Sequence, residues 1–216
     1  MGSKDFTETS NNILRENFER IIPTLKGVTL LPVTKTVDTS KIIAAKNILE
    51  SFGLPVIFGE NYAQELLKKR EEIDGAKFHF IGALQSNKIK SLIEAGAFIQ
   101  SIASEKHLQI ARKINKELDL FLQVNVSADP RKSGVSIDEA KRLLSLDFAP
   151  VRITGLMTIL EETEDINKIR ADYKKLAILG EGRLELSMGM SNDYKIAIEE
   201  GATMVRLGSV LFGDRG

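Results

Sequence analysis

Short apolar runs alternate with helix-like segments along almost the whole chain. Eight of these runs are rich in β-branched and leucine residues and have the length of buried strands. They begin near Val28, Pro55, Lys77, Ala97, Leu118, Pro150, Arg183 and Thr203. The segments between them, such as residues 42–52, carry apolar residues spaced three and four apart, which predicts amphipathic helices.

Eight alternating strand and helix units fit two architectures, an open doubly wound sheet or a closed eightfold barrel. The first and last strands begin 175 residues apart, about 25 residues per unit, which matches a compact barrel of about 200 to 250 residues. We therefore predict a single (β/α)8 TIM-type barrel over residues 28–213, preceded by a helix within residues 1–25. Since no linker or shift in composition divides the chain, residues 1–216 are expected to form one domain.

The charge balance and residue usage narrow the possible functions. Thirty acidic and 30 basic side chains give a formal net charge of zero, which argues against nucleic acid or an anionic membrane surface as the main partner. The sequence has no cysteine and two histidines, so thiolate chemistry is excluded and a histidine-rich metal site is disfavoured. No apolar stretch approaches the roughly 18 to 20 residues of a membrane span. We expect a cytoplasmic monomer or small homo-oligomer.

Lys35 stands at the C-terminal end of the first predicted strand, in "TLLPVTKT", residues 29–36. A lysine in such a place commonly just points into water. One held at the mouth of an apolar strand can instead have a lowered pKa, and a neutral amine forms Schiff bases. Because functional residues gather at the C-terminal ends of barrel strands, Lys35 is a candidate nucleophile.

The loops after the last two predicted strands have the composition of an anion site. They are "SMGMSND", residues 187–193, and "RLGSVLFG", residues 206–213. Both offer glycine, serine and free backbone amides before a possible helix, an arrangement that binds phosphate in many barrels. Gly189 and Gly208 could each merely turn the chain, but their joint position favours a phosphate site.

Arg206 is an anomaly in the last strand, because it lies inside the apolar run "TMVRLGSV" and alternates with Met204. An arginine that faces into a barrel needs a partner. Closure makes the first and eighth strands neighbours, so Lys35, Arg206 and the loop at residues 208–209 should lie at one rim. This group suits a phosphorylated ligand that forms an imine with lysine, either a cofactor or a phosphosugar substrate.

Six stretches form an ordered series of motifs. They are "VTKT" (33–36), "FGENYAQE" (58–65), "FHFIGALQSNK" (78–88), "VNVSADPRKSGV" (124–135), "GLM" (155–157) and "LSMGMSNDYKIAIEEGATMVRLGSVLFG" (186–213). The series resembles the pyridoxal phosphate homeostasis proteins, which are single-domain relatives of the alanine racemase N-terminal barrel. The resemblance covers nearly the whole chain from about residue 28 onward.

The resemblance implies a bound cofactor and the residues that hold it. Lys35 would carry pyridoxal 5′-phosphate (PLP) as an internal aldimine. Ser191, Gly208 and Ser209 would bind its phosphate, largely through backbone amides.

Four further residues receive roles or alternatives from the same resemblance. Arg206 would face the pyridine nitrogen of PLP, and Asn61, in "FGEN", would approach the cofactor. His79 lies either beneath the cofactor ring or simply packed in its strand. Lys88, in "QSNK", is either a solvated helix start or a surface or phosphate contact.

The expected arginine bears on catalysis. Enzymes that use the full electron-sink power of PLP commonly place a carboxylate against a protonated pyridinium, whereas an arginine disfavours that protonation by like-charge repulsion. The racemase relatives manage with such an arginine, but they add a tyrosine base from a further C-terminal domain, and none of Tyr62, Tyr173 and Tyr194 aligns with that role. We therefore expect a PLP-binding protein that holds the cofactor and delivers it, with PLP-requiring apoenzymes as candidate recipients and little or no turnover. A PLP-dependent amino acid racemase and a lysine Schiff-base aldolase are the alternatives.

Overall fold

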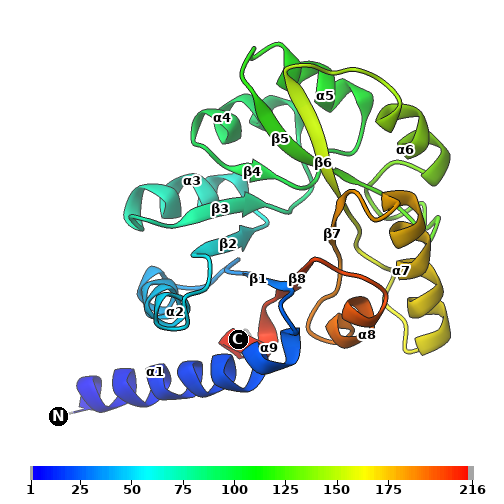
Figure 1. Cartoon of the computed structure of the whole chain (residues 1–216). Coiled ribbons are helices and arrows are strands. Elements are labelled where there is room, and N and C mark those ends of the chain that lie inside the picture. Colours follow the sequence, from blue (N-terminus) through cyan, green and yellow to red (C-terminus); the bar gives the residue numbers. More distant parts are fainter. Residues whose placement is uncertain (1, 214–216) are drawn as a thin grey trace.

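The computed structural model describes residues 2–213, with side chains from residue 11 onward, as a parallel barrel surrounded by helices (Figure 1). Within these residues the barrel has eight strands, one for each predicted apolar run. They are β1 (Thr29–Pro32), β2 (Ile57–Glu60), β3 (Lys77–Phe80), β4 (Phe98–Ile99), β5 (Leu118–Gln123), β6 (Val151–Met157), β7 (Glu185–Ser187) and β8 (Met204–Leu207).

Parallel pairing closes these strands into a ring. One sheet has the order β1-β8-β7-β6-β5 and the other β2-β3-β4. Single parallel bridges, Val33 with Gly59 and Ile102 with Leu122, join the two sheets at both junctions. The predicted TIM-type barrel is therefore confirmed, and Figure 1 shows the strands inside a ring of helices.

Helices follow the strands around the outside of the barrel. The α-helices are α1 (Gly2–Ile21), α2 (Thr39–Ser51), α3 (Ala63–Glu72), α4 (Ile89–Glu94), α5 (Glu105–Arg112), α6 (Ile137–Leu144), α7 (Ile166–Gly180), α8 (Tyr194–Glu199) and α9 (Ser209–Phe212), with short 3-10 helices η1 (Ile22–Leu25) and η2 (Ser86–Lys88). Side chains define several starts: at α6, Ser136 accepts a hydrogen bond from the backbone of Glu139, which satisfies an otherwise unpaired N–H.

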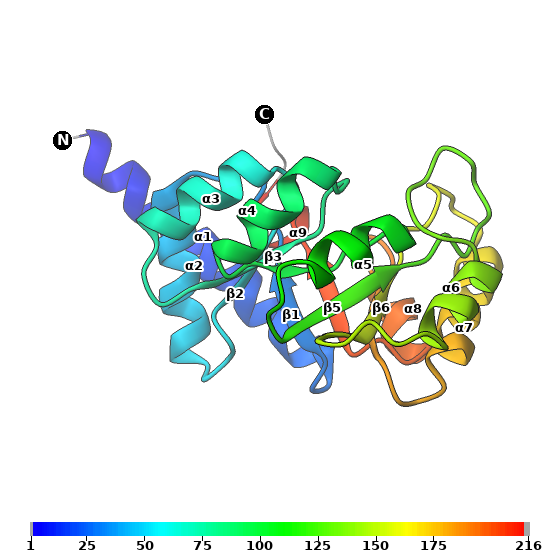
Figure 2. The ribbon, with the colours of Figure 1, turned by 90° about the horizontal axis from the view of Figure 1, so that it is seen from above.

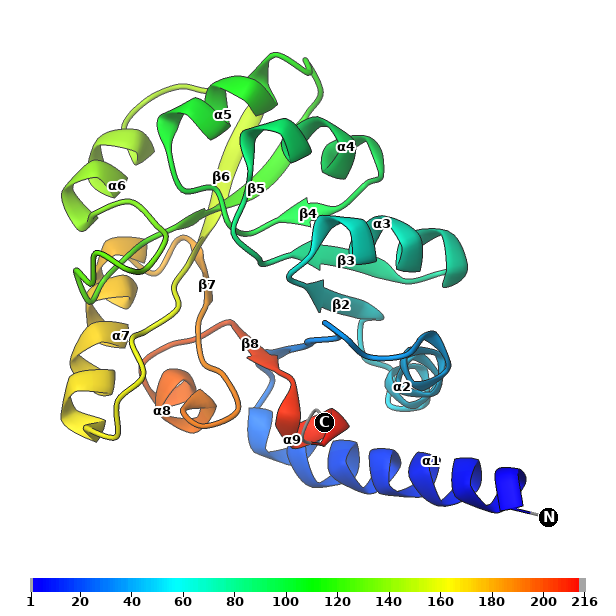
Figure 3. The ribbon, with the colours of Figure 1, turned by 180° about the vertical axis from the view of Figure 1, so that it is seen from behind.

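The predicted leading helix is α1, continued by η1 to Leu25. Its ribbon extends past the barrel at the N-terminal end (Figure 2), while its second half packs beside α9 (Figure 3). Phe18 meets Phe212 edge to face at a ring distance of 6.3 Å. One domain over residues 1–216 stays a prediction, and residues 1 and 214–216 of that range lie outside the described part.

Two apolar layers stabilise the barrel. The larger one lies between the strands and the surrounding helices, where alternate strand residues such as Phe58 and Phe78 are buried. The smaller one fills the barrel interior with Leu31, Val33, Ile57, Ile81 and Met204. Because successive strand residues point to opposite faces, this division tells which polar residues face the interior and which face the helices.

Candidate functional site

The C-terminal ends of β7, β8 and β1 lie side by side. The backbone N–H of Val33 donates to the carbonyl of Leu207 at 2.8 Å, and that of Arg206 donates to the carbonyl of Gly189 at 2.9 Å. The chain continues from these ends into loops that carry Lys35, Ser191, Gly208 and Ser209. The structure thus places these four predicted residues at one rim of the barrel, as strand closure required.

Lys35 sits in a tight turn. A hydrogen bond from the backbone N–H of Val37 to the carbonyl of Thr34, at 3.0 Å, closes the turn around Lys35 and Thr36. Lys35 is half-buried. Val33, two residues earlier, faces the barrel interior, so Lys35 follows directly at the rim where β1 ends.

Arg206 is buried in the barrel interior, and its guanidinium donates to neutral acceptors. Nη1 lies 2.6 Å from the carbonyl oxygen of Ser187 and 2.9 Å from the hydroxyl of the same residue. Nη2 lies 2.6 Å from the carbonyl oxygen of Thr158. Burial lowers the pKa of Arg206, and Tyr173 and Asp193 oppose this effect; the group stays a cation near neutral pH. The partner that an inward arginine needs is therefore supplied by backbone and hydroxyl oxygens.

A chain of hydrogen bonds connects Arg206 on β8 with His79 on β3. The hydroxyl of Ser187, which accepts from Arg206, donates to Oε1 of Gln100 at 2.6 Å. Nε2 of Gln100 lies 2.7 Å from Nδ1 of His79. The amide of Gln100 then donates to the imidazole, which leaves the proton of a neutral ring on Nε2. The interior of the barrel is thus ordered by one continuous polar chain.

His79 is a packed strand residue at the end of that chain. Its ring stacks on Phe98 with 4.8 Å between ring centroids and 30° between planes. Burial, with the nearby Lys77 as a second cause, lowers the pKa of His79 to about 4, so the imidazole is neutral at pH 7. The structure shows His79 packed in its strand against Phe98. The other alternative from the sequence, a place beneath a cofactor ring, stays a prediction.

The loop that carries Ser191 is fixed by Asp193. Its Oδ1 accepts from the backbone N–H of Met190 at 2.6 Å, and its Oδ2 accepts from the hydroxyl of Tyr173 at 2.8 Å. Burial and the charge of Asp193 raise the pKa of Tyr173, which keeps its hydroxyl protonated as a donor. Gly189 has a φ of +93°, and a Cβ there would lie 2.7 Å from the Cβ of Ala197, so this loop requires glycine.

The loop after β8 leads directly into α9. Gly208 is buried, Ser209 is exposed, and the helix begins between them. At the other end of α9, side chains bind consecutive carbonyls: Asn17 donates to Leu211 at 3.0 Å and Lys41 to Phe212 at 3.2 Å. The leading helix and α2 therefore fix the segment that begins with the predicted phosphate residues.

Asn61 lies just beyond β2, on the rim of a cleft of about 200 Å³. The same cleft is lined by Gly82, Gln123 and Lys132, among others. The Oδ1 atom of Asn61 is buried and has no hydrogen-bond partner among the described residues. A buried acceptor of this kind is costly unless a donor reaches it, so a bound molecule with an N–H or O–H group would fit here. A Cβ at Gly82 would lie 1.8 Å from the carbonyl oxygen of Asn61, so the two backbones need this glycine.

The sequence and structure of known proteins agree with this arrangement. The family model described as alanine racemase, N-terminal domain, matches residues 10–216. The pyridoxal phosphate homeostasis protein of Aquifex aeolicus is 36% identical over 198 residues, which cover 84% of this chain and 87% of that protein. The chain belongs to the pyridoxal phosphate homeostasis protein family.

Solved structures extend the comparison. PipY of Synechococcus elongatus, in a structure with PLP bound, is 31% identical and superposes with a TM-score of 0.77, covering 93% of this chain and all of that one. Alanine racemase of Corynebacterium glutamicum superposes with a TM-score of 0.74 at 16% identity, covering 95% of this chain and 61% of the racemase. The second likeness concerns the barrel fold alone.

Neither a membrane-spanning helix nor a cluster of metal-binding side chains occurs in the part of the chain that the structure describes. Within residues 2–213 no helix is both long enough and apolar enough to cross a membrane. The described side chains also form no group of three or more acidic, histidine or cysteine residues placed to hold a metal ion. Lys88 ends the 3-10 helix η2 immediately before α4. It thus lies at a helix start, which is one of the two alternatives that the sequence left open for it.

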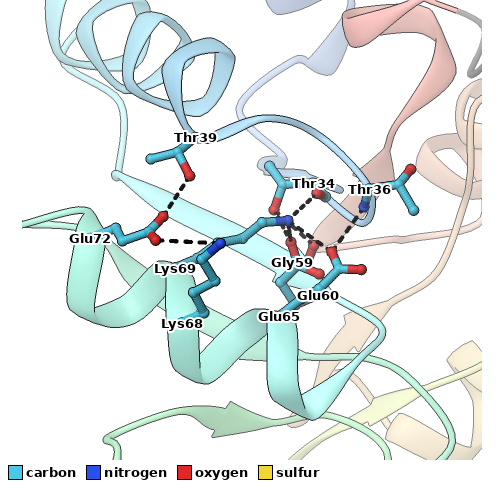
Figure 4. Close-up of polar contacts among 9 residues, drawn as sticks. All are labelled: Thr34, Thr36, Thr39, Gly59, Glu60, Glu65, Lys68, Lys69 and Glu72. Atoms are coloured by element: carbon cyan, nitrogen blue, oxygen red, sulfur yellow. Dashed lines mark hydrogen bonds and ion pairs between the residues drawn. The ribbon is translucent and has the colours of Figure 1, made fainter.

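The sequence reasoning missed a charged cluster on the outer side of β1 and β2. Glu60, Glu65 and Lys69, hereafter the Lys69 cluster, lie between the strands and α3 and contact Thr34 and Thr36 on either side of Lys35 (Figure 4). Burial raises the pKa of Glu60, and its bonds to Lys69 and Thr34 oppose this effect. The one signal in the sequence is an acidic residue at the end of a strand that is otherwise apolar.

Proposed function

We propose that this member of the pyridoxal phosphate homeostasis family binds PLP and holds it for delivery to PLP-requiring apoenzymes of the cytoplasm, with little or no turnover of amino acids. The observation that carries the proposal is the common rim: the ends of β1 and β8 present a half-buried lysine and a glycine-serine loop above a buried arginine. The PLP-bound structure of the similar PipY supports the identity of the ligand.

Each group at the rim has a role in binding. When bound, PLP supplies an aldehyde to which a neutral lysine amine attaches with loss of water, and Lys35 is the residue proposed for this attachment. Ser191, Gly208 and Ser209 would bind the phosphate through N–H and O–H donors.

Two other residues fit the rest of the cofactor. Arg206 would stand opposite the pyridine nitrogen, and its fixed positive charge would keep that nitrogen unprotonated. Asn61 offers a buried oxygen that needs a donor. This arrangement suits a protein that stores PLP better than one that stabilises carbanions, because carbanion stabilisation draws on a protonated ring.

Borohydride reduction followed by peptide mapping tests the attachment. We expect PLP to give a visible absorbance band that reduction removes, with the label on Lys35. The variant Lys35→Ala should lose the band while keeping some noncovalent binding through the phosphate. Label on Lys88 or Lys132 in the wild-type protein would show that the attachment site is wrong.

Transfer and exchange measurements test carrier against racemase. We expect PLP to pass from the loaded protein to an added apoenzyme, and we expect slow or absent exchange of the α-proton of both alanine enantiomers with solvent deuterium. Loss of one general acid/base alone removes a factor of about 10² to 10⁴ in rate. Rapid exchange with rapid inversion, both abolished by Lys35→Ala, would favour the racemase.

A further inference from the structure

The turn that carries Lys35 has a conformation that its sequence does not favour. Thr36 has a φ of +58°, in the left-handed region where turns usually place glycine and where a β-branched residue is an outlier. Such a conformation persists only when the surrounding structure imposes it, and it is found mostly at functional sites. The contacts that impose it therefore bear on the function of Lys35.

The Lys69 cluster holds the turn on both sides of Lys35. Nζ of Lys69 donates to the carbonyl oxygen of Thr34 at 2.6 Å. The backbone N–H of Thr36 donates to Oε2 of Glu65 at 3.0 Å. The hydroxyl of Thr34 donates to Oε1 of Glu60 at 2.6 Å. The residues before and after the lysine are thus bound to one rigid group on β2 and α3 (Figure 4).

Lys69 is the centre of this group. Besides Thr34, its ammonium lies 2.6 Å from Oε1 of Glu60 and 3.0 Å from Oε2 of Glu65, so each of its three N–H groups has an acceptor. Its side chain is 7% exposed, and that of Glu60 is fully buried.

The neighbouring residue on α3, Lys68, forms an ordinary surface ion pair instead of a buried one. Lys68 pairs with Glu72, and its side chain is 75% exposed. A buried ion cluster is weak evidence for stability, because well-packed apolar residues often serve as well. Because Lys69 contacts the backbone beside Lys35, the cluster can have a role other than stabilising the fold.

We propose that Lys69, held by Glu60 and Glu65, is a positioning residue that sets the strained turn and thereby aims the amino group of Lys35 into the barrel mouth. The inference rests on the proposed function, in which Lys35 attaches PLP. Lys69 belongs to α3, lies on the outer side of β2 and acts only through the backbone of the turn. Its removal should therefore slow attachment without removing any group of the ligand site.

Two variants and a matched control test the proposal. Lys69→Met removes the ammonium but keeps much of its length, Glu65→Ala removes the acceptor of the Thr36 N–H, and Lys68→Met changes the adjacent exposed lysine. Two quantities are measured: amide hydrogen exchange of residues 34–37 without PLP, and the rate at which the borohydride-sensitive absorbance appears after PLP is added. Circular dichroism establishes that each variant is folded.

In folded Lys69→Met we expect faster exchange of the turn amides and attachment slowed about 10-fold to 100-fold, the scale of loss when a reacting group is misplaced. Glu65→Ala should be slowed about threefold to tenfold on the same grounds, and Lys68→Met should match the wild type. If Lys69→Met does not fold, Glu65→Ala decides the matter.

Wild-type rates and wild-type exchange in the folded variants would overturn the positioning role. Failure of the proposed function looks different, because the wild-type protein would then carry its borohydride label on a lysine other than Lys35, or carry none. Slowed attachment in the variants with the label still on Lys35 supports both.

Discussion

Two buried cations in this barrel are held in opposite ways. Lys69 lies on α3, outside the strands, and its ammonium contacts the carboxylates of Glu60 and Glu65. Arg206 lies inside the barrel and donates to carbonyl and hydroxyl oxygens of Ser187 and Thr158. The charge of Lys69 is neutralised by the carboxylates in contact with it. The charge of Arg206 is solvated by neutral dipoles and still acts on nearby groups.

The difference explains why the two sites suit different tasks. Ions of opposite sign in direct contact fix one geometry and add little field beyond their surroundings, which suits the support of a turn. A cation bonded only through dipoles still acts on other groups nearby. Arg206 can thus disfavour a second positive charge in the barrel mouth, whereas the Lys69 cluster acts through the position of Lys35.

The largest effect that tests this comparison is the loss of stability expected when the Lys69 cluster is disrupted. Lys69→Met removes one partner of a buried ion pair and should lower the free energy of unfolding by about 3 to 5 kcal/mol at pH 7. Urea unfolding followed by circular dichroism measures the change. The exposed control Lys68→Met should stay within about 0.5 kcal/mol of the wild type.

Changing the pH sharpens that measurement. Burial already raises the pKa of Glu60, and the loss of Lys69 would raise it further. A carboxyl with a raised folded-state pKa adds stability at low pH and loses it as the pH rises through that pKa. The penalty of Lys69→Met should therefore be smaller at pH 5 than at pH 8, and an equal penalty at both values would contradict a buried ion pair.

The position of Arg206 could be predicted from the sequence, but the pairing of Lys69 could not. Arg206 could be placed because strand alternation and barrel closure depend on local pattern and on topology, and both can be read from the chain. The same reasoning placed Lys35 beside the loop of Gly208. The pairing of Glu60 with Lys69 depends on the distance and rotation of α3 relative to β2, which side-chain packing decides and which no periodicity encodes.

The next effect concerns the pH dependence of stability at His79, the end of the interior chain of hydrogen bonds. Burial holds the pKa of His79 at about 4, below the value of about 6.5 expected in the unfolded chain. The unfolded state therefore binds the proton first as the pH falls. Through this group the protein should lose up to about 3 kcal/mol of stability between pH 6.5 and pH 4.

Two measurements check the behaviour of His79. The variant His79→Phe, which keeps a ring against Phe98, should lose less stability than the wild type between pH 7 and pH 5 in urea unfolding. NMR of the imidazole should show no titration above about pH 5. A midpoint near 6.5 would show that the interior chain does not keep His79 neutral.

A smaller loss is expected at the interior cation itself. Arg206→Met deprives the carbonyl of Thr158 and the hydroxyl of Ser187 of a donor but leaves no ion unpaired, so the free energy of unfolding should fall by about 2 kcal/mol. Thermal or urea unfolding gives this value without PLP. A loss equal to that of Lys69→Met would mean that the two cations are not held differently.

The smallest effect is expected at Ser187, where the interior chain of hydrogen bonds can be cut without removing any ion. Ser187 donates to Gln100 and accepts from Arg206, so Ser187→Ala removes two hydrogen bonds but leaves the charge in place. The carbonyl of Ser187 continues to accept from Arg206 at 2.6 Å, which limits the cost to about 1 kcal/mol. Ser145→Ala, at an exposed hydroxyl, is the control and should change stability by less than about 0.5 kcal/mol. A loss at Ser187 as large as that of Arg206→Met would mean that the arginine is held by the hydroxyl rather than by the backbone carbonyls.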